Sequence, residues 1–126
     1  MSKTLDLREL VTAQLRTVSG GTYHQTAPHD AAYPYKVYTF ERIGLTDLTR
    51  DDLDLCIDVW DRGADSKAAD EIADRIEDLF NAANLPQTTI LPTFFRDSRY
   101  PVEDEDKLLK HIRLHFTVQN YAIHTT

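Results

Sequence analysis

The clearest pattern along the chain is a strict alternation of aliphatic and other residues from Leu53 to Trp60. Leucine, isoleucine and valine occupy every second position, and Asp54, Cys56, Asp58 and Trp60 stand between them. Because successive side chains of a strand point to opposite faces, this alternation predicts a strand with one face in the core. An unpaired carboxylate is too costly to bury, so we expect the other face to be solvated or to line a polar assembly surface.

Two segments carry the spacing of apolar residues, three and four positions apart, that is typical of amphipathic helices. The first has a plausible N-cap at Thr4 and is stopped by the glycine pair at 20–21. The second runs from Ala69 to Ala83, with acidic residues on the rest of its surface, and Pro86 prevents its continuation. Both apolar stripes are expected to pack against a sheet.

Three further segments predict strands. Tyr35–Arg42 is rich in β-branched and aromatic residues, and Ile112–Val118 alternates apolar residues with polar ones. Thr88–Arg96 has a similar composition but contains Pro92, which cannot donate a backbone hydrogen bond. We therefore expect this segment at an edge of the sheet or at a bulge.

The segments between these elements are polar or lack a period, so residues 22–35, 44–52 and 97–107 are expected to form loops. Consecutive strands with short connections favour antiparallel pairing. The order of elements thus predicts an α+β fold, a four-stranded, mainly antiparallel sheet with two helices packed on one face. A chain of 126 residues has the size of a single domain, residues 1–126.

Composition and charge narrow the possible functions. The net charge is −7, and residues 51–78 hold eleven acidic residues against three basic ones. This balance argues against a protein that wraps nucleic acid. The chain has no apolar run of the ~20 residues that cross a bilayer, so we expect no membrane partner.

Its one cysteine, Cys56, cannot form an internal disulfide or a cysteine-based zinc site, and nearby acidic charge is expected to raise the pKa of its thiol.

The histidines are the remaining candidates for chemistry. His111 and His115 stand in a strand pattern, which separates them by roughly 13 Å, and we expect both to be exposed rather than to share a metal. His24, His29 and Asp30 form a loose group in a loop, which keeps a small metal-assisted hydrolase as an alternative. The carboxylate pairs Asp54/Asp58 and Asp104/Asp106 have no apolar pocket indicated beside them, and the sequence contains no phosphate-binding glycine motif. We therefore expect no enzymatic activity, cofactor or metal.

Four stretches of the chain together carry a family resemblance. They are Pro34–Tyr38 (PYKVY), Ile57–Trp60 (IDVW), Ala68–Ile76 and Ile112–Tyr121. In this order they resemble the tail-completion or tail-terminator proteins of long-tailed bacteriophages, including the tail-to-head joining proteins.

The resemblance implies a virion structural protein that forms a hexameric ring at the head-proximal end of the tail tube. Such a ring stops tube polymerisation and provides the joint to the head or neck, while genomic DNA passes through its lumen without specific binding. The implied partners are further copies of this chain, the tail tube protein and the head–tail connector or neck protein. The implied location is the virion, after assembly in the host cytoplasm. A neck or head-completion protein of a phage or phage-derived particle is the alternative.

The polar face of the predicted sheet is the expected surface for subunit contact or for the ring lumen. Its candidate residues are Asp54, Asp58, Trp60, Arg113 and His115. Mixed polar and aromatic character suits a subunit contact or a wet lumen better than a second core. Identical subunits that contact each other head to tail close into a ring when the rotation allows it.

Overall fold

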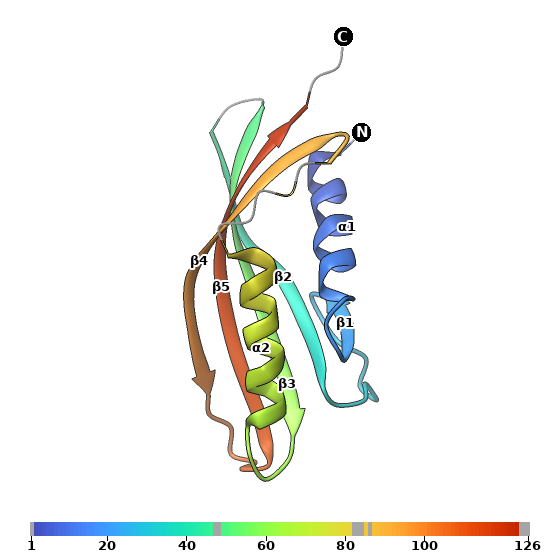
Figure 1. Ribbon diagram of the computed structural model, residues 1–126, viewed down its shortest axis with the longest axis vertical. Coiled ribbons are helices and arrows are strands. Elements are labelled where there is room, and N and C mark those ends of the chain that lie inside the picture. Colours follow the sequence, from blue (N-terminus) through green and yellow to red (C-terminus); the bar gives the residue numbers. More distant parts are fainter. Residues whose placement is uncertain (1, 47–48, 82–84, 86, 124–126) are drawn as a thin grey trace.

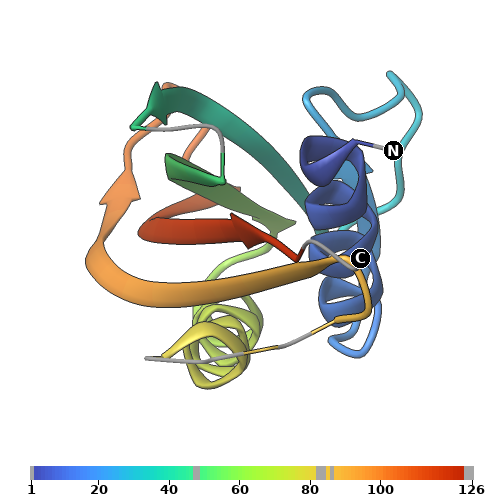
Figure 2. The same cartoon turned by 90° about the horizontal axis from the view of Figure 1, so that it is seen from above.

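The computed structural model describes residues 2–46, 49–81, 85 and 87–123, and it consists of one sheet with two helices on one face (Figures 1 and 2). The elements in chain order are α1 (Lys3–Leu15), β1 (Gly21–His24), β2 (Tyr35–Leu45), β3 (Arg50–Arg62), α2 (Lys67–Phe80), β4 (Ile90–Val102) and β5 (Leu109–Ala122). The predicted α+β class and the placement of both helices are confirmed. Neither helix has the length and apolar character needed to span a membrane.

The sheet has five strands in the order β1-β2-β3-β5-β4, rather than the predicted four. β1 pairs in parallel with the beginning of β2, where Gly21 lies opposite Tyr35, and the other neighbours are antiparallel. The expectation of a loop over residues 22–35 is therefore wrong for residues 22–24. β1 is only four residues long, too short to show an alternating pattern, and all four are half-buried. The prediction that the proline-containing strand lies at an edge is confirmed, because β4 is the last strand.

The core lies between the helices and the sheet. The aliphatic residues of β3 face the helices and are at most 2% exposed, as their alternation predicts. Apolar residues of β5 and of both helices complete the cluster. The buried core of these four elements consists of Leu7, Leu10, Val11, Leu15, Leu53, Leu55, Ile57, Val59, Ala69, Ile72, Ala73, Ile76, Phe80, Ile112, Leu114, Phe116 and Val118.

The two helices start and end differently from the prediction. The N-cap of α1 is Ser2, whose Oγ accepts a hydrogen bond from the backbone N–H of Leu5, and Thr4 lies inside the helix. α1 ends at Leu15, before the glycine pair. α2 ends at Phe80, and Asn81 is its C-cap residue with an extended backbone. Residues 82–83 of the predicted range lie outside the described residues.

A buried lysine fixes the path from α1 into β1. The Nζ atom of Lys36, on β2, donates to the backbone carbonyls of Val18, Ser19 and Gly20 at 3.0, 3.0 and 2.9 Å. Lys36 is fully buried, and burial lowers the pKa of its ammonium group to about 8. The three carbonyl oxygens offset the cost of placing a cation inside the protein. The sequence analysis did not anticipate this contact.

β2, β3 and β4 extend into segments that were expected to be loops. Leu45 pairs with Asp51, so residues 44–45 and 50–52 of the predicted connection belong to strands. Residues 47–48 lie outside the described residues. β4 continues to Val102, so the predicted loop 97–107 is wrong over residues 97–102. These extensions are rich in polar residues and lack the alternation that reveals a strand, and their backbone pairing with neighbouring strands orders them.

Candidate functional site

The face of the sheet that points away from the helices, here called the outer face, carries all five predicted site residues. Asp54, Asp58 and Trp60 come from β3, and Arg113 and His115 come from the neighbouring β5. The register places Asp58 opposite Arg113, whereas Asp54 lies further along β3, opposite Thr117. The sheet thus brings these residues to one face without placing them in one cluster.

Asp58 is the centre of an ion-pair network on this face. Its Oδ1 accepts hydrogen bonds from His111 Nε2 at 2.6 Å and from Arg113 Nε at 2.8 Å. Burial by itself raises the pKa of the Asp58 carboxyl, but the hydrogen bonds from His111 and Arg113 outweigh burial and lower the pKa overall. The expectation that His111 is exposed is wrong, because the residue is only 6% exposed.

A row of aromatic rings crosses the outer face beside this network. The ring centroids of Tyr33 and Tyr35 lie 5.3 Å apart, those of Tyr35 and Trp60 lie 6.4 Å apart, and those of Trp60 and His111 lie 3.7 Å apart. Trp60 therefore covers the imidazole that Asp58 binds. Tyr33, at the end of the row, is 43% exposed and offers an aromatic surface to a neighbouring molecule.

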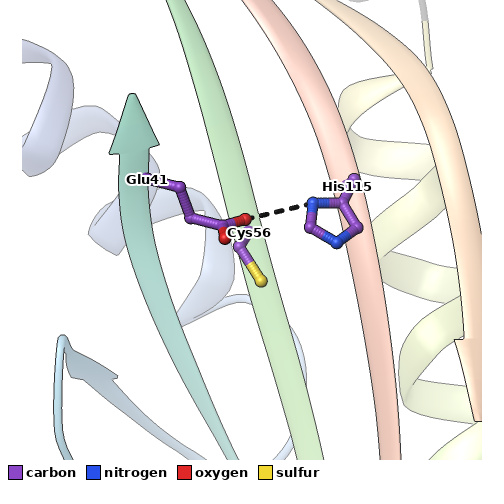
Figure 3. A group of neighbouring side chains, drawn as sticks. All are labelled: Glu41, Cys56 and His115. Carbon is purple, nitrogen blue, oxygen red and sulfur yellow. Dashed lines mark ion pairs between the residues drawn. The ribbon is translucent and has the colours of Figure 1, made fainter. Parts of the chain in front are cut away.

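A second cluster lies at the middle of the outer face, where Glu41 of β2, Cys56 of β3 and His115 of β5 point toward one another (Figure 3). One potential ligand atom from each residue lies within 4.8 Å of the other two. His115 Nδ1 is 3.2 Å from Glu41 Oε1, and His115 Nε2 is 3.2 Å from the hydroxyl of Tyr100. Cys56 is buried, and burial together with the charges of Asp58 and Glu41 raises the pKa of its thiol to about 12.

Two bulges flank this cluster. The register shifts between Phe40 and Arg42 in β2, which leaves Glu41 without a partner residue in β3. It shifts in the same way around Asp97 in β4. A bulge re-aims a side chain relative to the regular alternation of a strand. Sequence reasoning missed Glu41 because neither bulge has a signature in the local pattern.

The loop group that the sequence suggested, His24, His29 and Asp30, does not form a cluster of potential metal ligands among the described residues. Within the described part of the chain, the one group of three histidine, cysteine or acidic residues close enough to hold a metal is the cluster of Glu41, Cys56 and His115. His24 lies at the end of β1, with its ring 4.9 Å from that of Tyr38, whereas His29 and Asp30 are exposed in the following segment. The geometry therefore does not support a hydrolytic site at these three residues.

The fold and the outer face define an α+β domain with helices on one side of a sheet and a polar, aromatic surface on the other. The model of the tail completion protein gp17 family matches residues 7–119, and the chain belongs to this family. The predicted family resemblance is therefore confirmed, and the protein is a bacteriophage structural protein of the tail completion type.

A solved structure has a similar fold. It is a chain in the virion of a native gene transfer agent particle, with a TM-score of 0.69 and 18% sequence identity. The similarity covers 88% of this chain and 84% of that chain, so it includes nearly the whole domain. A comparison with curated proteins gave no match.

Proposed function

We propose that this protein is a tail terminator, a virion structural protein that forms a hexameric ring at the head-proximal end of the phage tail tube. The observation that carries this proposal is membership of the tail completion family over residues 7–119. In this role the ring stops polymerisation of the tube and provides the joint to the head or neck. The chain assembles in the host cytoplasm and remains in the virion, in contact with the tail tube protein and a connector or neck protein. No catalytic step is part of this role.

The similar chain from a gene transfer agent particle supports the proposal at the level of the fold. That chain is a component of a virion, and it shares the domain architecture over most of its length. A domain of this architecture is therefore compatible with incorporation into a particle.

We further propose that the outer face supplies the subunit contact or the lining of the lumen. The face combines the ion pairs of Asp58 with the ring of Trp60, and it ends in the exposed ring of Tyr33. Asp54, Arg113 and His115 complete this surface. Polar groups interleaved with aromatic rings are typical of interfaces between subunits. The two edge strands, β1 and β4, also present backbone groups that a neighbouring subunit can cover.

The charge of the chain suits a lumen through which DNA must move. Affinity for DNA comes largely from cations that replace the counterions of the phosphates. A net charge of −7 gives little such affinity, so a ring of identical chains does not retain the genome by charge. Passage without specific binding follows from this balance.

Disruption of the gene in its phage tests the proposal. Without a terminator, we expect filled heads without tails, together with free tails whose tubes are irregular in length and often too long. Complementation with the wild-type gene must restore particles. Free tails of uniform, normal length would contradict tube termination and would favour the neck or head-completion role. Normal infectious particles would contradict both roles.

Imaging of wild-type particles provides a second test. We expect density for this domain in a six-fold layer between the tail tube and the neck. Another symmetry in that layer, or a position elsewhere in the particle, would contradict the hexameric terminator.

A further inference from the structure

We propose that Glu41, Cys56 and His115 form a zinc-binding site on the outer face of the sheet. The proposal is independent of the role in the tail, because it rests on the geometry of three side chains from three adjacent strands (Figure 3). A carboxylate, a thiolate and an imidazole are all zinc ligands, and the thiolate selects zinc over magnesium or calcium.

The distances within the cluster fit tetrahedral coordination. Two nitrogen or oxygen ligands at ~2.05 Å from zinc are separated by ~3.3 Å, and His115 Nδ1 lies 3.2 Å from Glu41 Oε1. The sulfur of Cys56 lies within 4.8 Å of a carboxylate oxygen of Glu41 and of a ring nitrogen of His115, and in a zinc site it must approach its fellow ligand atoms to ~3.6 Å. Rotation of the Glu41 side chain, which is 49% exposed, and of the His115 ring can close this gap.

Tyr100 prepares His115 for this role. Its hydroxyl lies 3.2 Å from His115 Nε2, and the two rings are stacked with centroids 5.8 Å apart. When Nε2 donates its proton to the hydroxyl, Nδ1 is left with a free lone pair on the side of the ring that lies near Glu41. Histidine ligands of metals characteristically make such a hydrogen bond through their second nitrogen. Tyr100 is therefore a positioning residue for the site.

The surroundings favour a cation and leave room for a fourth ligand. A cavity of about 220 Å³ adjoins the cluster and is lined by Glu41, Asp54, Asp97 and His115, with Phe116. Glu41 and Asp97, the residues at the two bulges, both line this cavity. The fourth position of zinc is thus open to water or to the carboxylate of Asp54 or Asp97.

Binding requires loss of the thiol proton. Without metal a cysteine thiol, whose ordinary pKa is about 8.5, is mostly protonated at neutral pH. Zinc takes the sulfur lone pair as the proton leaves to solvent, so the metal exchanges with one proton and no oxidant is involved. The bound ion would tie β2 to β5 through β3, the strand between them.

Metal titration of the untagged 126-residue protein tests the site. We expect one zinc ion per chain by calorimetry, and one cobalt ion with the near-ultraviolet charge-transfer absorption of a cobalt–thiolate bond. Cys56→Ala must abolish this absorption. His115→Gln and Glu41→Gln each remove a ligand and must weaken zinc binding by about 100-fold or more, which exceeds the loss typical of a residue that only hydrogen-bonds a ligand. Tyr100→Phe, which keeps the ring stacking, is expected to weaken binding about tenfold.

His29→Gln is the matched control, because His29 is exposed and distant from the cluster in the sequence. This variant must bind zinc like the wild type. Circular dichroism and thermal unfolding of each variant without metal show whether it is folded. Absence of stoichiometric zinc binding by the wild type would overturn the proposal. Cobalt binding by the wild type without a thiolate band would overturn it as well, without any need for a variant.

Discussion

Trp60 and His111 lie opposite each other on β3 and β5, and their rings stack on the outer face with planes inclined by 14°. The stacking covers the imidazole, which leaves the residue only 6% exposed although its strand position faces away from the core. The carboxylate of Asp58 then supplies the polar partner that a covered imidazole requires. The proposed contact with another subunit would therefore meet a surface whose side chains are already ordered.

The network around Asp58 should make a measurable contribution to stability. We expect Asp58→Asn to lower the free energy of unfolding by about 2 kcal/mol, because His111 and Arg113 lose a charged acceptor that is 20% exposed. Asp54→Asn, on the same face of the same strand, is the control and should change stability by less than about 0.5 kcal/mol. Urea unfolding at neutral pH measures both. Equal effects of the two substitutions would contradict the network.

The same carboxylate predicts a pH dependence. The folded-state pKa of Asp58 is below the ordinary value of 3.8, so the folded protein binds this proton less readily than the unfolded chain does. Its contribution to stability is therefore complete above the ordinary pKa and is lost as the pH falls through the lower folded value. The difference between wild type and Asp58→Asn should shrink below about pH 4. Unfolding curves over an acid series would show this, and a difference that grew in acid would contradict it.

Lys36 is expected to be essential for the junction between α1 and β1. Lys36→Met preserves much of the side-chain volume but leaves three backbone carbonyls without their cation. We expect a loss of about 3 kcal/mol in the free energy of unfolding. Lys107→Met, at an exposed position, should be nearly neutral. Chemical unfolding of the two variants compares them directly, and a neutral Lys36→Met would show that the carbonyls find other partners.

Arg99 connects the extension of β4 to α2 through Asp70, Asp74 and Glu77. Its side chain is 26% exposed, so solvent screens the pairs in part. We expect Arg99→Gln to destabilise the protein by about 1 kcal/mol, and the loss should decrease at high salt.

Arg96→Gln is the matched control for Arg99. Among the described residues Arg96 makes one ion pair, with Glu77, and its side chain is 56% exposed. A change below about 0.5 kcal/mol is expected, as for a single surface pair. Thermal unfolding at low and high salt separates the two variants. A loss at Arg99 that is independent of salt would show that its role is packing rather than charge.

Assembly can be tested separately from stability. Asp54→Lys reverses a charge on the outer face and should leave the unfolding free energy nearly unchanged. The affinity between subunits should fall about tenfold for each ~1.4 kcal/mol lost at the contacts, and particle yield should fall as a result. Glu71→Lys, exposed on α2, is the control for the charge change and should assemble normally. Asp58→Lys is less suitable, since it would place a cation beside Arg113 and His111 and destabilise the fold. Normal particles from folded Asp54→Lys would contradict an outer-face contact at this residue.

The local pattern of the sequence determined the type of each long element and the side of β3 and β5 that enters the core. This was possible because periods of two and of about 3.6 residues are set by backbone geometry within one segment. Leu55 and Ile57 are buried, as predicted, because the strand must place alternate residues on one face. The family resemblance also depended only on short stretches and their order.

Contacts between segments that are distant in the sequence determined the features that the local pattern did not, above all which polar residues meet. Asp58 meets His111 and Arg113 across separations of 53 and 55 residues, and these pairs depend on the register between β3 and β5. The bulge at Glu41 turns that side chain toward Cys56 and His115. Register and bulges arise when strands pair, and no periodicity within one strand encodes them. The tertiary structure alone therefore determined which polar residues of the outer face lie together.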